Sequence, residues 1–176
     1  WHLSIHLIRD YWDPWSRFTE VMDPLQTSDE DFDRRVFDVV DVEGFLRVLG
    51  ARILTGDGDA LFLTTGKNGY MVWTPERGWG LLPFDMGGAN DLFPSLTEVD
   101  DISVARMLRS APVLRIYYRL LLEYANGYWS ELASPFFDAL EDHPNAPEVS
   151  SCRNRVAFGS NVVKLSLIHI SEPARQ

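Results

Sequence analysis

The chain is poor in cysteine and in long apolar runs, and both shortages limit what it can be. Cys152 is the single cysteine among 176 residues, so neither an internal disulfide nor a metal site of several cysteines can form. No apolar run approaches the length of a membrane-spanning helix, so we expect no membrane span in this sequence.

Basic residues are also in the minority, with 16 Lys and Arg against 26 Asp and Glu, which gives a formal net charge of −10. An acidic balance argues against a nucleic-acid partner, because a nucleic-acid backbone requires a basic face on the protein. It is compatible with a metal-dependent site, and also with simple solubility. We expect most of the carboxylates, such as those in residues 28–33, to be solvated.

Hydrophobic residues make up 45% of the chain, which is enough for one core, and the length favours a single domain. The apolar pattern is clear to residue 142 and fades after Pro144. We therefore expect a folded domain over 1–142, an irregular segment over 143–164 and a tail over 165–176. The tail resembles the translation of a transposase adapter used in DNA sequencing libraries, so we expect it to make no part of the fold. Because the chain also begins at Trp1, we expect it to be a fragment of a larger protein.

Apolar residues at helical spacing predict most of the secondary structure. One helix is expected after Asp41 and before Gly56, one after Asp100 or Asp101, and one from Pro112 to Asn126-Gly127. A further apolar stripe follows over 129–140. Residues 1–20 are rich in aromatic residues at loosely helical spacing, which Asp13-Pro14 is expected to interrupt. Residues 24–40 are expected to be a polar loop with a short amphipathic piece.

Two short runs predict a β-hairpin between these helices. Tyr70–Trp73 and Gly80–Leu82 are typical of strands, and Pro75–Gly78 between them has turn residues in suitable places. The predicted fold class is therefore α+β, mostly helical with one small hairpin.

Three polar residues surround this hairpin in an order that suggests phosphoryl transfer. Asp59 precedes it on a loop, Asn68 opens its first strand, and Asp85 follows its second strand directly. A loop carboxylate such as Asp59 can accept a proton from a substrate hydroxyl, while the Asn68 and Asp85 oxygens are hard ligands that suit Mg²⁺. Protein kinases place their catalytic Asp, Asn and metal-binding Asp in the same order.

Each of these residues also has a purely structural interpretation. The segment Gly56-Asp-Gly-Asp59 has good turn chemistry, Asn68 is a common turn residue, and Asp85 is suited to cap the amides of Gly87-Gly88. His2 and His6 stand four apart and would share one helix face, but no third metal ligand is apparent.

Four segments, in this order, resemble the spore coat protein H (CotH) kinase family. They are Val40-Asp-Val-Glu-Gly-Phe-Leu46, Leu54-Thr-Gly-Asp-Gly-Asp59, Asn68-Gly-Tyr-Met-Val-Trp73 and Leu82-Pro-Phe-Asp-Met86. That family typically shows an Asp-x-x-x-Phe helix, a Leu-Thr-Gly-x-x-Asp turn, an Asn-Asn-Tyr-Tyr-Leu-Tyr strand and a Pro-Trp-Asp-Leu-Asp segment. The resemblance covers residues 36–142.

The resemblance implies an atypical protein-kinase-like C-terminal lobe that transfers phosphate from ATP to Ser or Thr of a protein. It implies Asp59 as the catalytic residue, with Asn68 and Asp85 binding Mg²⁺ and the ATP phosphates. It also implies the bacterial spore coat, the cell surface or secretion as the location.

The sequence departs from the family pattern at three places. Phe84 replaces the usual Trp, Gly69 replaces an Asn, and the Gly87–Gly88 pair stands where a second Asp is common. Asn90 and Asp91 follow closely and offer substitutes.

The kinase N-terminal lobe is not visible in the sequence. No Gly-rich loop and no strand Lys precedes residue 59, and the only lysines are Lys67 and Lys164. We therefore expect the N-terminal lobe to be missing and this fragment alone to be inactive.

Two other functions stay open. The first is a non-catalytic coat or surface module that uses the kinase-like fold for protein contacts, which the absent second Asp favours slightly. The second is a glycoside hydrolase with Asp59 and Asp85 as acid and base, about 5–10 Å apart. It is disfavoured because Asn68 and the paired glycines would have no role.

Overall fold

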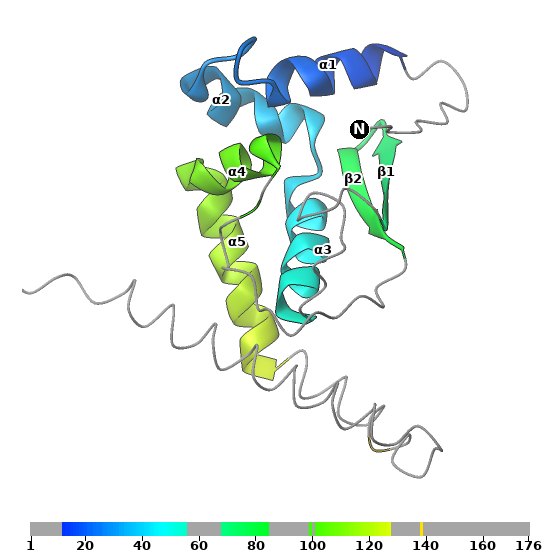
Figure 1. Ribbon diagram of the computed structural model, residues 1–176, viewed down its shortest axis with the longest axis vertical. Helices are drawn as coiled ribbons and strands as arrows, with labels where there is room; N and C mark the ends of the chain where they lie inside the picture. The colour runs from blue at the N-terminus through cyan, green and yellow to red at the C-terminus, as the bar shows by residue number, and fades with distance from the viewer. Residues whose placement is uncertain (1–11, 56–67, 85–98, 100, 128–137, 139–176) are drawn as a thin grey trace, which may run out of the picture.

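The computed structural model describes residues 12–55, 68–84, 99, 101–127 and 138 (Figure 1). Five helices and a two-stranded antiparallel sheet lie within these ranges: α1 (Trp12–Met22), α2 (Asp29–Val39), α3 (Val42–Thr55), β1 (Gly69–Thr74), β2 (Gly78–Pro83), α4 (Ile102–Arg109) and α5 (Ala111–Glu123). The described part of the chain is therefore mostly helical with one small hairpin, which confirms the α+β class.

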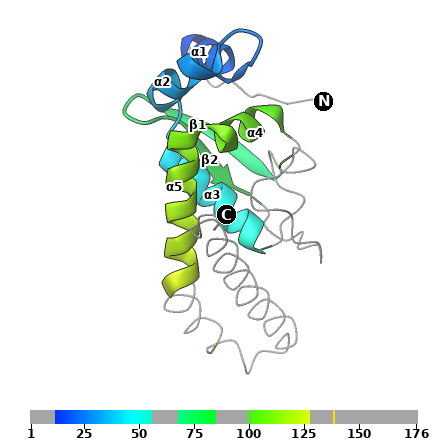
Figure 2. The same cartoon turned by 90° about the vertical axis from the view of Figure 1, so that its left-hand side faces the viewer.

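Helix α3 is the central element, and its sequence explains its position. Asp41 caps it, because the Gly44 amide donates to the Asp41 Oδ1 at 3.1 Å. Five apolar residues on one face of it are at most 3% exposed: Val42, Phe45, Leu46, Leu49 and Ile53. They share the helical spacing that predicted the helix, and α3 packs against both α5 and β2 (Figures 1 and 2).

The predicted helices α4 and α5 are also confirmed. Asp101 caps α4 by accepting from the Ser103 and Val104 amides at 2.9 and 3.0 Å. Pro112 lies in the first turn of α5, where its missing N–H costs no helical bond. The helix runs on into a π-helical turn over 124–127, which places its end where Asn126-Gly127 predicted it.

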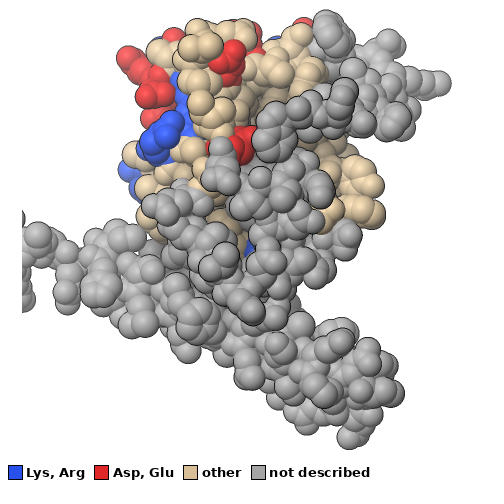
Figure 3. Space-filling view, in the orientation of Figure 1, with Lys and Arg blue, Asp and Glu red and all other residues tan. Residues whose placement is uncertain are grey.

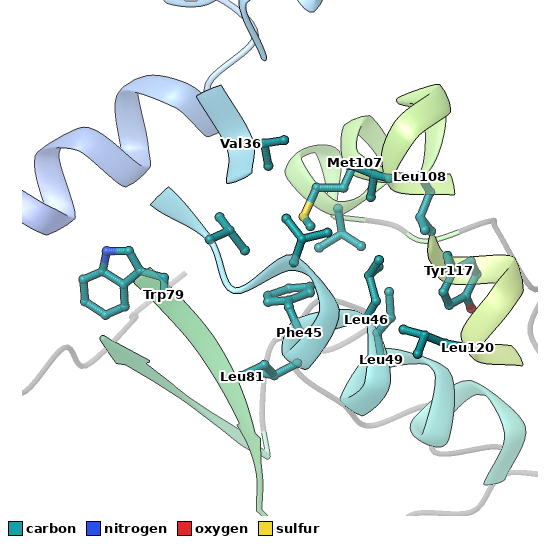
Figure 4. Packing of buried hydrophobic residues seen from close by; sticks show 14 of the residues in the cluster. Val36, Phe45, Leu46, Leu49, Trp79, Leu81, Met107, Leu108, Tyr117 and Leu120 are labelled. Atoms are coloured by element: carbon teal, nitrogen blue, oxygen red, sulfur yellow. The ribbon is translucent and has the colours of Figure 1, made fainter. Parts of the chain in front are cut away.

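The core lies where α2, α3, β2, α4 and α5 meet (Figure 4). Phe45 and Leu46 from α3 lie between Leu81 of the hairpin and Met107 of α4, and all four are at most 4% exposed. Fully burying such a side chain contributes about 1.5–3 kcal/mol to folding. Residues from both ends of the described chain thus build one core.

One expectation for the N-terminal part is wrong. Asp13-Pro14 does not interrupt a helix but lies in the first turn of α1, where a proline is tolerated and a negative charge favours the helix dipole. In residues 24–40 the expected amphipathic piece is a complete helix, α2, which follows a short connection. The Ser28 Oγ caps it by accepting from the Asp31 amide at 3.2 Å, so the acidic run after Ser28 begins a helix.

The β-hairpin has the predicted strands and turn. Tyr70 pairs with Leu82 and Thr74 with Gly78, so the turn falls over 75–77. Gly78 has a φ of +79°, and a Cβ there would lie 2.6 Å from the Val39 carbonyl oxygen. A glycine is therefore required at this point, where the hairpin passes close to the chain that enters α3.

Trp79 attaches the closed end of the hairpin to the helices. Its backbone carbonyl accepts from the Asp41 amide at 2.9 Å, and Val40 forms a parallel bridge with it. Its indole Nε1–H donates to the Pro14 carbonyl at 3.0 Å, and its ring contacts Trp15 and Phe18. The α1 helix and the hairpin are thus joined by an aromatic cluster.

Arg106 of α4 ties the connection between α1 and α2 to the core. It is 3% exposed and donates to the carbonyls of Val21 and Thr27 and to the Asp29 carboxylate, at 3.1 Å in the last case. Its guanidinium also lies 4.5 Å from the centre of the Phe32 ring. One buried cation therefore holds a turn and the start of α2 in place.

Several predictions fall outside the described residues. They concern the pair His2 and His6, the stripe over 129–140, Cys152, and the segments 143–164 and 165–176. Among the described helices, none has both the length and the apolar character needed to cross a membrane.

Candidate active site

Of the three predicted site residues, the structure describes Asn68. Asp59 and Asp85 lie in the ranges 56–67 and 85–98, outside the described residues. The structure does describe the ends of the three elements that flank these residues in the sequence: the end of α3, the start of β1 and the end of β2. The candidate site is described from the ends of these elements.

Asn68 stands at the open end of the hairpin, opposite Phe84. Gly69 pairs with Pro83, and the Phe84 amide donates a long hydrogen bond of 3.4 Å to the Asn68 carbonyl. Asp85 is bonded directly to Phe84, so its Cα lies within about 3.8 Å of the Phe84 Cα. The pairing thus brings the backbone that carries one predicted ligand close to the attachment point of the other.

The backbone of Asn68 has a left-handed conformation, with a φ of +57°. Few side chains tolerate this region, and Asn and Gly are the commonest that do. The conformation gives Asn68 a structural reason to be Asn, alongside the proposed role as a ligand. The two roles are compatible, because the first concerns the backbone conformation of Asn68 and the second concerns its side-chain amide oxygen.

Arg52, in the last turn of α3, holds the open end of the hairpin together. Its side chain is fully buried, and one of its terminal nitrogens donates both to the Asn68 carbonyl and to the Phe84 carbonyl, the latter at 3.0 Å. Buried backbone carbonyls must be hydrogen-bonded. The Asn68 carbonyl also accepts from the Phe84 amide, and Arg52 adds one donor group that serves both this carbonyl and that of Phe84.

Helix α3 and strand β2 are fastened to each other at both ends. At the start of α3, the Asp41 amide donates to the Trp79 carbonyl, and near its end Arg52 donates to the Phe84 carbonyl. From Asp41 to Arg52 a helix rises about 16 Å. From Trp79 to Phe84 a strand spans about 16 Å. The two lengths are similar, and α3 packs along β2 (Figure 1).

Three chain ends therefore meet around the Arg52 guanidinium. Helix α3 ends at Thr55, three residues after Arg52, and the hairpin begins and ends at the two carbonyls that Arg52 holds. In the sequence, Asp59 follows Thr55 by four residues and Asp85 follows Phe84 directly, and both lie outside the described residues.

The outer face of the hairpin, beside Asn68, is apolar and exposed. Tyr70, Val72, Leu82 and Phe84 have between 40% and 56% of their surface accessible. The rings of Tyr70 and Phe84 meet edge to face, 5.2 Å apart. The opposite face of the hairpin carries Trp79 and Leu81, which are buried against the helices. The hairpin thus separates the core from an apolar surface.

Charged groups elsewhere form ion pairs between neighbouring elements. Glu43 of α3 accepts from Arg47 and from Arg119 of α5, each at 2.8 Å, and these hydrogen bonds hold the pKa of Glu43 below its ordinary value. Both signs of charge occur close together on the face drawn in Figure 3. Within the described ranges, no group of three or more His, Cys, Asp and Glu side chains is placed to hold a metal ion.

Sequence reasoning missed Arg52, although a signal was present. Arg52 follows Phe45 by seven residues and Leu49 by three, so it occupies the buried stripe of α3 at helical spacing. A charged residue at an apolar position of a helix indicates a buried polar contact. The contact partners could not be named from the sequence, because they depend on how α3 lies against the hairpin.

Comparison of the chain with protein-family models, with curated proteins and with solved structures gives no match.

Proposed function

We propose that this chain is the catalytic-lobe part of a magnesium- and ATP-dependent kinase of the CotH type that phosphorylates protein Ser or Thr. The observation that carries the proposal is the open end of the hairpin. There the Asn68 and Phe84 backbones are held together by Arg52, at the end of the helix that leads to Asp59. A phosphotransferase requires the residue that accepts the substrate's hydroxyl proton and the metal ligands to lie around one point. The arrangement of these chain ends is compatible with that requirement.

The predicted ligands have the chemistry that magnesium requires. The amide oxygen of Asn68 and the carboxylate of Asp85 are hard oxygen donors, and Mg²⁺ typically binds proteins through one or two such groups together with substrate phosphates. The ion would supply neutralisation of charge on those phosphates. Asp59 would accept the proton of the acceptor hydroxyl, and Asn68 and Asp85 would orient the phosphates.

Substitutions in the full-length protein test these roles separately. Asp85→Asn is expected to abolish phosphoryl transfer with the fold intact, because a neutral amide holds Mg²⁺ far less tightly than a carboxylate does. Asp59→Asn is expected to slow transfer but to retain binding of Mg²⁺-ATP, since it removes a proton acceptor and no metal ligand. Transfer of radiolabelled phosphate to protein and thermal melting with Mg²⁺-ATP are the two measurements.

Asp57→Asn is the matched control, because Asp57 stands two residues before Asp59 in the sequence and is assigned to turn chemistry alone. It is expected to leave both transfer and the Mg²⁺-ATP effect on melting close to those of the parent protein. Full transfer activity in the Asp85→Asn protein would refute the kinase assignment.

A non-catalytic interaction module is the second candidate. The exposed apolar face of the hairpin favours it, because soluble monomers rarely expose a contiguous apolar surface without a use for it. A full-length protein that binds no Mg²⁺-ATP, and whose partner binding is unaffected by Asp59→Asn and Asp85→Asn, would support this candidate over the kinase.

A further inference from the structure

Burying the Arg52 side chain inside a small domain costs free energy. Its side chain is fully buried at the end of α3, although an arginine is always charged and burying a charge is costly. A buried charged group is weak evidence for stability, since an apolar group of similar volume often stabilises as well or better. The location of the hydrogen bonds that Arg52 donates therefore says more about its role than its burial does.

Two of those bonds lie at the candidate active site. The guanidinium donates to the carbonyls of Asn68 and Phe84, which belong to the two opposite strands of the hairpin. Beyond the pair Gly69 and Pro83, strand pairing ends, so a long amide bond of 3.4 Å is the remaining ladder contact at this point. Arg52 adds two hydrogen bonds at the point where the strand pairing ends.

We infer that Arg52 is a positioning residue, which fixes the distance between the Asn68 and Phe84 backbones so that their side of the hairpin can hold a divalent cation with its nucleotide. The inference rests on the proposed function and adds a residue to it. In this inference Arg52 acts on the site through the Asn68 and Phe84 carbonyls. Groups that orient metal ligands typically change metal affinity about 10-fold or more when they are lost.

Two substitutions grade the effect. Arg52→Met removes both hydrogen bonds and places an unbranched apolar side chain at this position. Arg52→Lys keeps a positive charge and hydrogen-bond donors, but on a shorter side chain without the planar fork of the guanidinium. We expect amide hydrogen exchange at Phe84 to be about 10-fold faster in Arg52→Met, with a smaller increase in Arg52→Lys. The dissociation constant for Mn²⁺-ATP, measured by calorimetry on the full-length protein, should rise in the same order.

Two controls separate positioning from a general loss of stability. Arg106→Lys alters the other buried arginine, and it should lower the urea midpoint without changing Phe84 exchange or Mn²⁺-ATP affinity. Asn68→Gly keeps the left-handed backbone and the carbonyl that Arg52 holds, but removes the amide oxygen. It should weaken Mn²⁺-ATP binding while leaving exchange at Phe84 unchanged.

The possible results decide the inference and the proposed function separately. If amide exchange at Phe84 is unchanged in Arg52→Met, the positioning role is overturned, whether or not the affinity for Mn²⁺-ATP changes. Faster exchange with unchanged Mn²⁺-ATP affinity overturns the link between Arg52 and the site. A parent protein that binds no Mn²⁺-ATP overturns the proposed function and that link together, while the exchange data still decide whether Arg52 holds the hairpin.

Discussion

Two buried arginines do the same physical work in two regions of this protein, with different consequences. Arg52 of α3 and Arg106 of α4 are 0% and 3% exposed, and both donate to backbone carbonyls of segments distant in sequence. Around Arg106 the partners lie in one continuous segment, the end of α1 and the start of α2. Around Arg52 the two carbonyls belong to opposite strands, beside the predicted metal ligands.

The comparison shows how one device can serve either the scaffold or the site. The Arg106 region also has a carboxylate partner, Asp29, and an aromatic ring, Phe32, so it is a complete structural cluster. No predicted site residue takes part in it. Removing Arg106 should therefore change stability alone, while removing Arg52 should change the binding of metal and nucleotide as well.

The largest expected effect is that of Arg106→Met on stability. The substitution leaves the Val21 and Thr27 carbonyls without their buried donor and Asp29 without its partner. Asp29 is 95% exposed and stays hydrated, so the loss comes from the two carbonyls left without a donor, at about 1–3 kcal/mol for each. Urea denaturation followed by circular dichroism measures the loss, and the midpoint should fall with little change in slope.

Arg109→Met is the matched control for that experiment, since Arg109 is an exposed arginine on the same helix. Its effect should stay within about 0.5 kcal/mol. Equal losses from Arg106→Met and Arg109→Met would mean that the buried cluster contributes nothing particular, and the contrast between the two buried arginines would lose its basis.

The second effect concerns the closed end of the hairpin, the opposite end from Asn68. Gly78→Ala places a Cβ 2.6 Å from the Val39 carbonyl oxygen, in a backbone with a φ of +79°. We expect a loss of about 1–3 kcal/mol in the free energy of unfolding. Gly80→Ala is the control, because the nearest atom to its Cβ, the Val72 carbonyl oxygen, is 3.9 Å away. A similar cost for both would show that strand propensity, and not the close contact, sets the loss.

The regular elements were largely predictable because their signals are local. The spacing of Phe45, Leu46 and Leu49 identifies the buried face of α3, and Asp101 identifies the start of α4. The pattern predicts an interruption at Asp13-Pro14, which is wrong, because the helix begins at Trp12 and places that proline in its first turn. Whether a proline interrupts a helix depends on where the helix begins, and the spacing of apolar residues defines that start poorly.

The site was predictable only as an order of residues along the chain. Asp59, Asn68 and Asp85 follow from turn and strand signals, and the hairpin register then brings Asn68 opposite Phe84. The buried contact of Arg52 was not predicted, because it needs the matched lengths of α3 and β2 and a fastening at both ends. That information is tertiary, and no local pattern carries it.

The third prediction concerns the conformation of Asn68 itself and distinguishes backbone fit from ligand chemistry. Asn68→Val is expected to cost about 1–2 kcal/mol, because a branched side chain is strained at a φ of +57°. Asn68→Gly should leave the free energy of unfolding within about 0.5 kcal/mol of the parent, since glycine adopts this conformation readily. Thermal and urea unfolding of both variants provide the comparison. A stable Asn68→Val protein would contradict the left-handed backbone.

The smallest effect is expected in the exposed ion pairs between α3 and α5, where Glu43 contacts Arg47 and Arg119. The pKa of Glu43 is lowered in the folded protein by these hydrogen bonds. The stabilisation is therefore present above the pKa of an unfolded glutamate, about 4.3, and is lost as the pH falls through the lower folded value. Glu43→Gln should reduce the melting temperature slightly at pH 7 and hardly at all at pH 3.

Salt should reduce the difference at pH 7, because exposed pairs are screened. Glu76→Gln, at an exposed glutamate of the hairpin turn, is the control and should leave the pH dependence of melting as in the parent protein. If Glu43→Gln instead lowered the melting temperature as much as Arg106→Met does, exposed and buried cations would contribute alike. Burial would then no longer explain why Arg52 and Arg106 contribute more to stability than exposed arginines do.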